Sequence, residues 1–227
     1  MGAETLILCQ PDDKKGCSAC CGLFNFKDTS KQHLTQFLNT GCRRSSEHRN
    51  SGTDTNTGNC FNVREATSYI CPHQGFIFHG RPGCLLHPRY GRNSGRNNSF
   101  FGEKICESFL CPAHSILDEE QKKIIMTYID DWYYYAVAVI DPASIHWFLA
   151  LLTETYHVDT NGSDLFKKTF SDFLGIHARY LLKFSGSIFF YSVSEYNIGK
   201  KNFSLISDAN HLEQEKYDIR AAIETSL

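Results

Sequence analysis

The sequence predicts an α-rich α+β protein, in which a cysteine-rich, loop-dominated N-terminal half packs on a helical C-terminal half. All ten cysteines lie before Ser115, whereas apolar residues at helical spacing dominate the chain after it. Pro and Gly stand beside the clustered cysteines, as tight turns require. We therefore expect two regions, residues 1–115 and 116–227, with a boundary near Ser115.

Composition limits the classes of function. A chain of 227 residues is long enough to bury a core. Its net charge of -2 gives no electrostatic reason to expect nucleic acid or an anionic membrane as a partner. No apolar run approaches the roughly 20 residues that span a bilayer, and the first residues lack the basic start of a secretory signal. We therefore expect a cytoplasmic protein whose cysteines are reduced rather than paired in disulfides.

The N-terminal half is expected to hold short elements between polar loops. Leu6 to Leu8 fits either a short edge strand or a lead-in to the first cysteines. Ser30 is a good N-cap for a helix over 31–38 that Gly41 ends, and Phe76 to Phe78 suits a buried strand. Two polar stretches, about 43–60 and 90–99, are expected to be exposed, mobile loops.

The C-terminal half is expected to be a set of helices. One helix is predicted from Leu117 through Val139, with acidic residues near its start. Asp141 and Pro142 form an N-cap and a first helical residue for a second helix that reaches Leu152. A turn over 161–163 precedes a third helix over 166–181. A strand over 187–193 and a last, more polar helix over 207–227 complete the prediction.

The first cysteine cluster lies near the N-terminus. Cys17, Cys20 and Cys21 stand at i, i+3 and i+4, which brings Cys20 and Cys21 back to the side of Cys17 in a helical turn or a knuckle. The two adjacent cysteines still diverge by about 100°, so two metals or a cluster use the set better than one metal does. Gly22 is expected to let backbone amides approach and hydrogen-bond the sulfurs.

The second cluster runs from residue 71 to residue 114. Thiolate and imidazole are ligand types that zinc and iron favour, and this stretch supplies Cys71, Cys84, Cys106, Cys111 and His114. Cys106 and Cys111 would point about 140° apart on one helix, so the chain must break between them. Pro112 favours that break, and Cys111 and His114 have the Cys-x-x-His spacing of compact zinc turns.

The remaining candidates are open to simpler interpretations. Isolated cysteines are often buried core residues, and we assign Cys9, Cys42 and Cys60 to that class. His73 and His87 could serve as outer hydrogen-bond donors or have no role at the site. Arg81 either offsets thiolate charge or is an exposed cation in a turn over 81–83. Asp130 and Asp131 face different directions on a helix, which disfavours a joint acid/base role.

The N-terminal half resembles the CxxCxxCC-type family of zinc- or iron-chelating proteins. In that family a Cys-x-x-Cys-Cys run is followed by single cysteines around an Arg-Pro dipeptide. The matching positions here are Cys17, Cys20, Cys21, Cys71, Arg81, Pro82 and Cys84, with Cys106 or Cys111 as terminal ligands. The resemblance covers roughly the first half and implies metal chelation.

These observations favour a cytoplasmic metal-binding protein, with zinc preferred over iron or an iron–sulfur cluster. Two other classes stay open. One is an enzyme that uses the metal as a Lewis acid or a cysteine as the nucleophile. The other is a protein-interaction module in which the metal only stabilises the surface that binds a partner. The sequence shows no Gly-x-Ser-x-Gly, Walker or dinucleotide motif, and it identifies no catalytic residue, substrate or protein partner.

Overall fold

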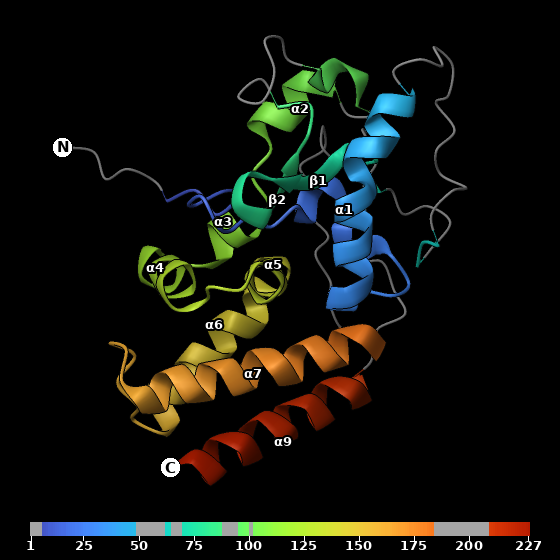
Figure 1. The fold of residues 1–227 in the computed structure, drawn as a ribbon. Helices are drawn as coiled ribbons and strands as arrows, with labels where there is room; N and C mark the ends of the chain where they lie inside the picture. The colour runs from blue at the N-terminus through green and yellow to red at the C-terminus, as the bar shows by residue number, and fades with distance from the viewer. Residues whose placement is uncertain (1–5, 49–61, 65–69, 88–94, 100–101, 184–208) are drawn as a thin grey trace, which may run out of the picture.

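The protein is helix-rich, with one small sheet (Figure 1). The structure is a computed structural model, and it describes residues 6–48, 62–64, 70–87, 95–99, 102–183 and 209–227. The helices are α1 (Lys31–His48), α2 (Gly102–Ser108), α3 (Ala113–Ile116), α4 (Glu119–Tyr128), α5 (Trp132–Ile140), α6 (Pro142–Ala150), α7 (Asp164–Lys183) and α9 (Ala209–Ser226). The strands are β1 (Gln74–Ile77) and β2 (Arg81–Cys84). The predicted α-rich class is therefore confirmed at this level.

One hydrophobic core runs through both halves of the chain. It includes Leu8, Leu23 and Phe24 from the N-terminal segments together with most of α5, α6 and α7. Helix α5 is central because every residue from Tyr135 to Ile140 is buried. The predicted boundary at Ser115 falls inside α3, and core residues come from both sides of it.

Stacked aromatic rings fill the core between α6 and α7. The ring centroids of Phe148 and Phe173 lie 4.1 Å apart with nearly parallel planes, and Phe170 is stacked with these two rings at 5.9 and 6.3 Å. Figure 1 shows α7 and α9 side by side and antiparallel along one edge of the molecule. These rings stabilise the fold in two ways, because their apolar area is removed from water and because the rings contact one another favourably.

The single helix predicted over 117–139 is wrong, because the chain forms α4 and α5 with a break at 129–131. Asp118 starts α4 with a full capping box, its carboxylate accepting from the Gln121 amide. Asp131 starts α5 by accepting from the amides of Tyr133 and Tyr134 at 2.9 and 3.3 Å. A second N-cap inside an apolar periodicity thus divides one predicted helix into two.

Replacing Asp131 by alanine is expected to lower the free energy of unfolding by about 1 kcal/mol, because the first amides of α5 lose their acceptor. Asp130→Ala is the matched control, since Asp130 is exposed and caps nothing that the structure describes. Urea denaturation of both variants measures the difference. Equal destabilisation by the two substitutions would contradict the capping role.

The other helix boundaries in the C-terminal half follow the sequence closely. Asp141 caps α6 through the Ser144 amide, and Pro142 occupies the first helical turn, as predicted. Helix α6 continues into a π-helical turn, Leu151–Thr155, and residues 161–163 separate it from α7. The predicted last helix is confirmed as α9, whereas the predicted strand over 187–193 lies outside the described residues.

Helix α1 begins as predicted but ends later. The Ser30 hydroxyl accepts from the His33 amide at 3.3 Å, which confirms the N-cap. The helix then continues through Gly41 to His48, so the predicted end at Gly41 is wrong and 43–48 is not loop. A glycine inside a helix costs only about 1 kcal/mol, which neighbouring turns can offset. Residues 49–60 and 90–94 of the predicted polar loops lie outside the described residues, whereas 95–99 contain a 3-10 turn, Arg96–Asn98, in which Arg96 is buried and not exposed as predicted.

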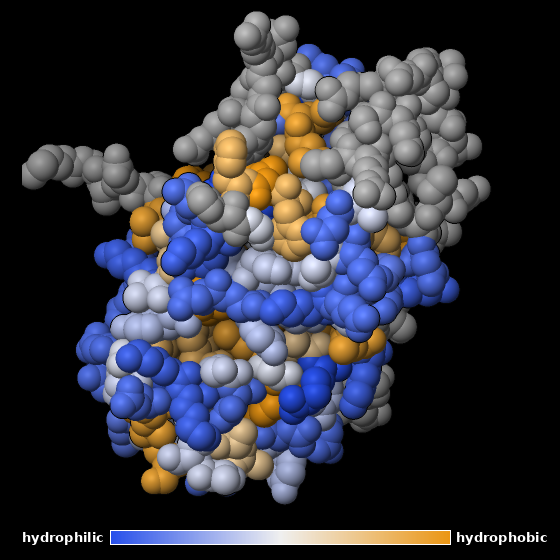
Figure 2. Space-filling model, viewed as in Figure 1, coloured by the Kyte–Doolittle hydropathy of each residue, from blue (hydrophilic) through white to orange (hydrophobic). Residues whose placement is uncertain are grey.

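The two strands form an antiparallel hairpin with Gln74 opposite Cys84. The connecting turn, Phe78–Gly80, needs a glycine because Gly80 has a φ of 77°. Residues 81–83 are strand rather than the predicted turn. Phe78 is 57% exposed and not buried as predicted, and Figure 2 shows apolar surface gathered over this upper part of the molecule.

The N-terminal lead-in has no strand within the described residues 6–8. Leu8 is instead buried in the core, and its carbonyl accepts a hydrogen bond from the Tyr135 hydroxyl at 2.8 Å.

A helix that crosses a bilayer must be both long and apolar. No single described helix is long and apolar enough to do so. Trp132–Ile140 and Pro142–Thr155 meet the criterion only as a pair, and the pair bends by 91°. Most of these residues belong to the core described above.

Candidate metal-binding site

The structure describes the side chains of eight cysteines, and all eight are free thiols that approach one another in one connected group. We call this group the thiol cluster. Its members are Cys9, Cys17, Cys20, Cys21, Cys71, Cys84, Cys106 and Cys111. They come from the N-terminal segment, the hairpin region, α2 and the turn before α3. Segments as far apart as residues 9 and 111 are therefore brought together by the fold.

The Cys-x-x-Cys-Cys run folds as a 3-10 turn over Ala19–Cys21. Ser18 and Gly22 flank the turn with positive φ angles of 46° and 76°, so the backbone reverses sharply on both sides. The Gly22 amide donates to the Ala19 carbonyl at 2.9 Å. The tight turn is a knuckle rather than part of a longer helix.

Backbone contacts fix this knuckle against the hairpin segment. The Cys21 carbonyl accepts from the Cys71 amide at 2.8 Å and from the Gln74 side chain at 3.0 Å. A Cβ atom at Gly16 would lie 2.4 Å from the Pro82 carbonyl oxygen, so glycine is required for this close approach. The two cysteine clusters predicted from the sequence therefore form one site region.

Cys9, which is partly buried, and Cys17, which is buried, form a hydrogen-bonded pair of thiols. The Cys17 amide donates to the Cys9 carbonyl at 3.2 Å, which closes the chain between them into a loop. A hydrogen bond with Cys17 is the main cause that lowers the pKa of Cys9 to about 5, against burial and with help from His114. The same hydrogen bond, together with burial, raises the pKa of Cys17. Within this pair, Cys9 is therefore the thiol that ionises more readily, and its sulfur accepts from the Cys17 thiol.

Cys111 and His114 lie beside this pair. The predicted break in the chain is confirmed, because α2 ends at Ser108 and α3 begins at Ala113. The His114 Nε2 lies 3.7 Å from the Cys9 sulfur. Burial raises the pKa of Cys111 to about 12, although the amides of Ala113 and His114 donate to its sulfur and act in the opposite direction.

The other thiols lie toward the hairpin and α2. Cys21 is hydrogen-bonded to Cys20 and Cys71, and these contacts with burial raise its pKa. Burial also raises the pKa of Cys84 to about 11, and it raises that of Cys106. Cys106 is exposed and lies 3.4 Å from the Ser99 hydroxyl, measured from sulfur to oxygen. This side of the thiol cluster is thus the more accessible one.

Two buried arginines stand near the site, and the charge of one of them, Arg96, acts on two of the thiols. Arg96 lowers the pKa of Cys84 and Cys106, although burial outweighs it at both residues. Arg81 is 2% exposed, so the predicted exposed cation is wrong, and its guanidinium donates to the Asp12 carbonyl. Arg81 therefore supports the loop that carries Cys9 and Cys17.

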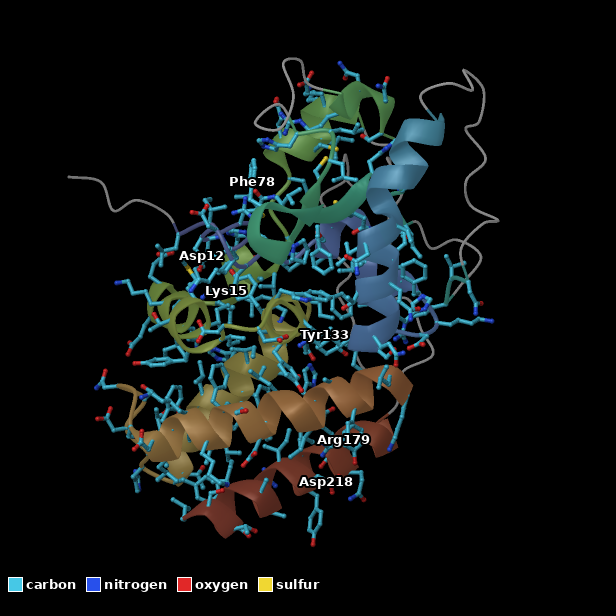
Figure 3. The ribbon with its side chains drawn as sticks, viewed as in Figure 1. Asp12, Lys15, Phe78, Tyr133, Arg179 and Asp218 are labelled. Atoms are coloured by element: carbon cyan, nitrogen blue, oxygen red, sulfur yellow. The ribbon has the colours of Figure 1, made fainter. Side chains whose placement is uncertain are left out.

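The loop between Cys9 and Cys17 is held to the helical half through Lys15. The Asp12 carboxylate accepts from the Lys14 and Lys15 amides at 2.7 and 2.8 Å. The Lys15 ammonium is buried, donates to the Met126 carbonyl at 2.5 Å and pairs with Asp12 at 3.1 Å. Figure 3 shows Asp12 and Lys15 adjacent to each other beside α4. Hydrogen bonds to a buried ammonium offset the cost of burying it.

The structure places the sequence-predicted residues as follows. The seven cysteines and His114 predicted as ligands all lie in the site region, whereas His73 and His87 flank the hairpin and are partly buried. Asp131 is an N-cap and Asp130 is exposed, as expected for a pair without an acid/base role. Cys9, Arg96 and Tyr135 are not among the predicted site residues, since none of them has a neighbouring ligand in the sequence.

The donor set fits a thiophilic metal. Sulfur and imidazole nitrogen are the ligands of zinc and of iron–sulfur centres. In the described part of the chain, no group of three or more His, Cys, Asp or Glu side chains could hold a metal ion as it stands. Rotation of a cysteine between staggered χ1 positions moves its sulfur by about 3 Å, so metal binding requires side-chain rotation.

Comparison of the chain with protein-family models, with curated proteins and with solved structures found no match in any of the three.

Proposed function

We propose that this is a cytoplasmic metal-binding protein that holds zinc through the thiol cluster, in line with its resemblance to the CxxCxxCC-type family. The observation that carries the proposal is that eight thiols from distant segments approach one another. Cysteines that served only as small core residues would have no reason to gather in one place. Metal binding gives that reason, because several thiolates repel one another until a cation lies between them.

The number of thiols favours a closed site with a structural role. A catalytic zinc keeps one coordination position open for water or substrate, whereas structural sites use four protein ligands. The surplus of sulfur ligands here suits closed sites. Zinc is preferred over iron because four-thiolate zinc is the commoner outcome in a reducing compartment, and the cysteine spacing matches no ferredoxin run. A colourless preparation agrees with zinc, and a brown one with absorbance near about 400 nm would assign iron.

Ligand substitutions test the proposal on the full chain, purified without oxygen. Cys17→Ser, Cys20→Ser, Cys71→Ser and Cys84→Ser are each expected to lower the bound metal by at least half an equivalent per chain, because each removes a thiolate of the cluster. Elemental analysis measures the bound metal, and thermal melts report the accompanying loss of stability.

Cys42→Ser and Cys60→Ser are the matched controls, because the same chemical change is made at cysteines that the sequence places outside both clusters. These two variants should keep the wild-type metal content. Loss of metal in Cys42→Ser with retention in Cys71→Ser would refute the ligand assignment. A wild-type chain that takes up neither zinc nor iron would refute the proposed function itself.

A further inference from the structure

The thiol cluster has two ends that differ in ligands and in exposure. Cys17 and Cys111 are 2% and 4% exposed, and they lie with Cys9 and His114 on the side of the core. Cys106 is exposed, and Cys84 is only partly buried, on the side of the hairpin and α2. The deeper end contains a histidine in contact with a thiol, since the His114 Nε2 lies 3.7 Å from the Cys9 sulfur.

At the deeper end, the distance between one sulfur and one nitrogen is close to that of two ligands on one metal. Zinc bonds of about 2.3 Å to sulfur and about 2.0 Å to nitrogen, at the tetrahedral angle, separate the two ligand atoms by about 3.5 Å. The Cys9 sulfur and the His114 Nε2 are 3.7 Å apart. The Cys17 thiol is hydrogen-bonded to the Cys9 sulfur, so a third ligand atom is adjacent.

Tyr135 lies on α5 next to the segment that carries Cys9. Its hydroxyl is fixed by the Leu8 carbonyl at 2.8 Å, directly before Cys9 in the chain. Burial is the main cause that raises the pKa of Tyr135. The negative charges of Cys17, Cys9, Asp12 and Cys111 raise it further, in that order. The charges of all three cysteines of the deeper end thus act on one phenol of α5.

Local backbone geometry positions the fourth ligand. Cys111 and His114 are three residues apart in a turn that the His114 amide closes by donating to the Cys111 carbonyl at 3.0 Å. The amides of Ala113 and His114 also approach the Cys111 sulfur. Amide donors to a sulfur stabilise its thiolate form and orient it for a metal.

We infer that the deeper end is a separate metal site with three sulfur ligands and one nitrogen ligand, supplied by Cys9, Cys17, Cys111 and His114. The inference deepens the proposed function and rests on it. Cys9, an isolated residue in the sequence, becomes a ligand. The outer thiols then serve a second metal, and their candidates are Cys20, Cys21, Cys71, Cys84 and Cys106. The inner metal connects the N-terminal loop to the turn before α3 against α5.

The test uses the full chain loaded with zinc alone in the absence of oxygen. The wild-type protein is expected to bind two zinc ions, and Cys9→Ser and His114→Gln are each expected to bind one fewer. Cys84→Ser should lose the other zinc. His146→Gln is the matched control for His114→Gln, because His146 is exposed on α6 and contacts Gln121. It should bind as much zinc as the wild type.

X-ray absorption at the zinc edge gives a measurement that does not depend on the folding of Cys9→Ser or His114→Gln. In Cys84→Ser the remaining zinc should have three sulfur neighbours and one nitrogen neighbour. A shell of sulfur only, or wild-type zinc content in Cys9→Ser, overturns the inner site while the proposed function stands. One zinc in the wild type, lost equally in Cys9→Ser and Cys84→Ser, overturns the division into two sites. No zinc in the wild type overturns both the inference and the zinc assignment.

Discussion

Removal of the metal with a chelator is expected to unfold the cysteine-bearing segments while α5, α6 and α7 remain folded. The segments over 9–25 and 70–87 contain only 3-10 turns and one hairpin, so little regular hydrogen bonding holds them. Structural zinc contributes on the order of 10 kcal/mol to folding, which is comparable with the whole stability of a domain. The stacked rings between α6 and α7 do not depend on the thiols.

Hydrogen exchange followed by mass spectrometry measures this outcome on the full chain. Peptides from 9–25 and 71–87 should lose protection when the chelator is added, and peptides from α7 should keep it. The double variant Cys17→Ser/Cys71→Ser is the control, since it should already exchange rapidly and respond no further. Unchanged protection in every peptide of the wild type would show that the metal does not support these segments.

Glu215→Ala is expected to lower the free energy of unfolding by about 3–5 kcal/mol, because it removes one partner of a buried ion pair. Glu215 on α9 and His177 on α7 are 2% and 1% exposed, and their side chains meet at 2.5 Å. Asp141, the N-cap of α6, lies 3.4 Å from the other ring nitrogen of His177. The substitution leaves the histidine buried with a single carboxylate partner.

Glu213→Ala is the matched control on the same helix. Glu213 is 73% exposed and pairs with Lys216 at 3.2 Å, and such a surface pair contributes about 1 kcal/mol or less. Urea denaturation of both variants gives the comparison. Equal stability losses would mean that the buried pair does not hold α9 against α7.

The ion pair between His177 and Glu215 makes the packing of α9 against α7 dependent on pH. Burial acts to lower the pKa of His177, but the hydrogen bond to Glu215 and the charges of Glu215 and Asp141 outweigh it and raise the pKa above its ordinary value of 6.5. The pair's contribution is therefore complete below pH 6.5 and is lost as the pH rises through the raised pKa. The stability difference between wild type and Glu215→Ala should shrink over that range.

Sequence patterns predicted the helical half well where local signals were strong. Asp141 with Pro142, Ser30 and the turn over 161–163 gave correct helix starts, because capping is decided by a few adjacent residues. The break between α4 and α5 was missed because the apolar periodicity continues across it. At Gly41 the opposite error occurred, because a helix end was predicted where α1 continues. The free-energy cost of a glycine inside a helix is small compared with the contribution of tertiary contacts.

The site was predictable only where its residues are clustered in the sequence. The spacing of Cys17, Cys20 and Cys21 and of Cys111 and His114 is by itself typical of metal ligands. Cys9 carries no such signal, because its partner His114 lies 105 positions away. Arg96 likewise belongs to a polar stretch by composition, and only the fold brings its charge to Cys84 and Cys106. Long-range neighbours of this kind cannot be inferred from periodicity or spacing.

The hydrogen bond from Tyr135 to Leu8 has a consequence during synthesis of the chain on the ribosome. Its two residues are 127 positions apart. At about 5–20 residues per second, a ribosome needs roughly 6–25 s to add that stretch after Leu8. During that interval the first four cysteines of the described chain have left the ribosome or are leaving it without the helix that they pack against. Nascent chains therefore expose unprotected thiols to oxidants and to free metal for many seconds.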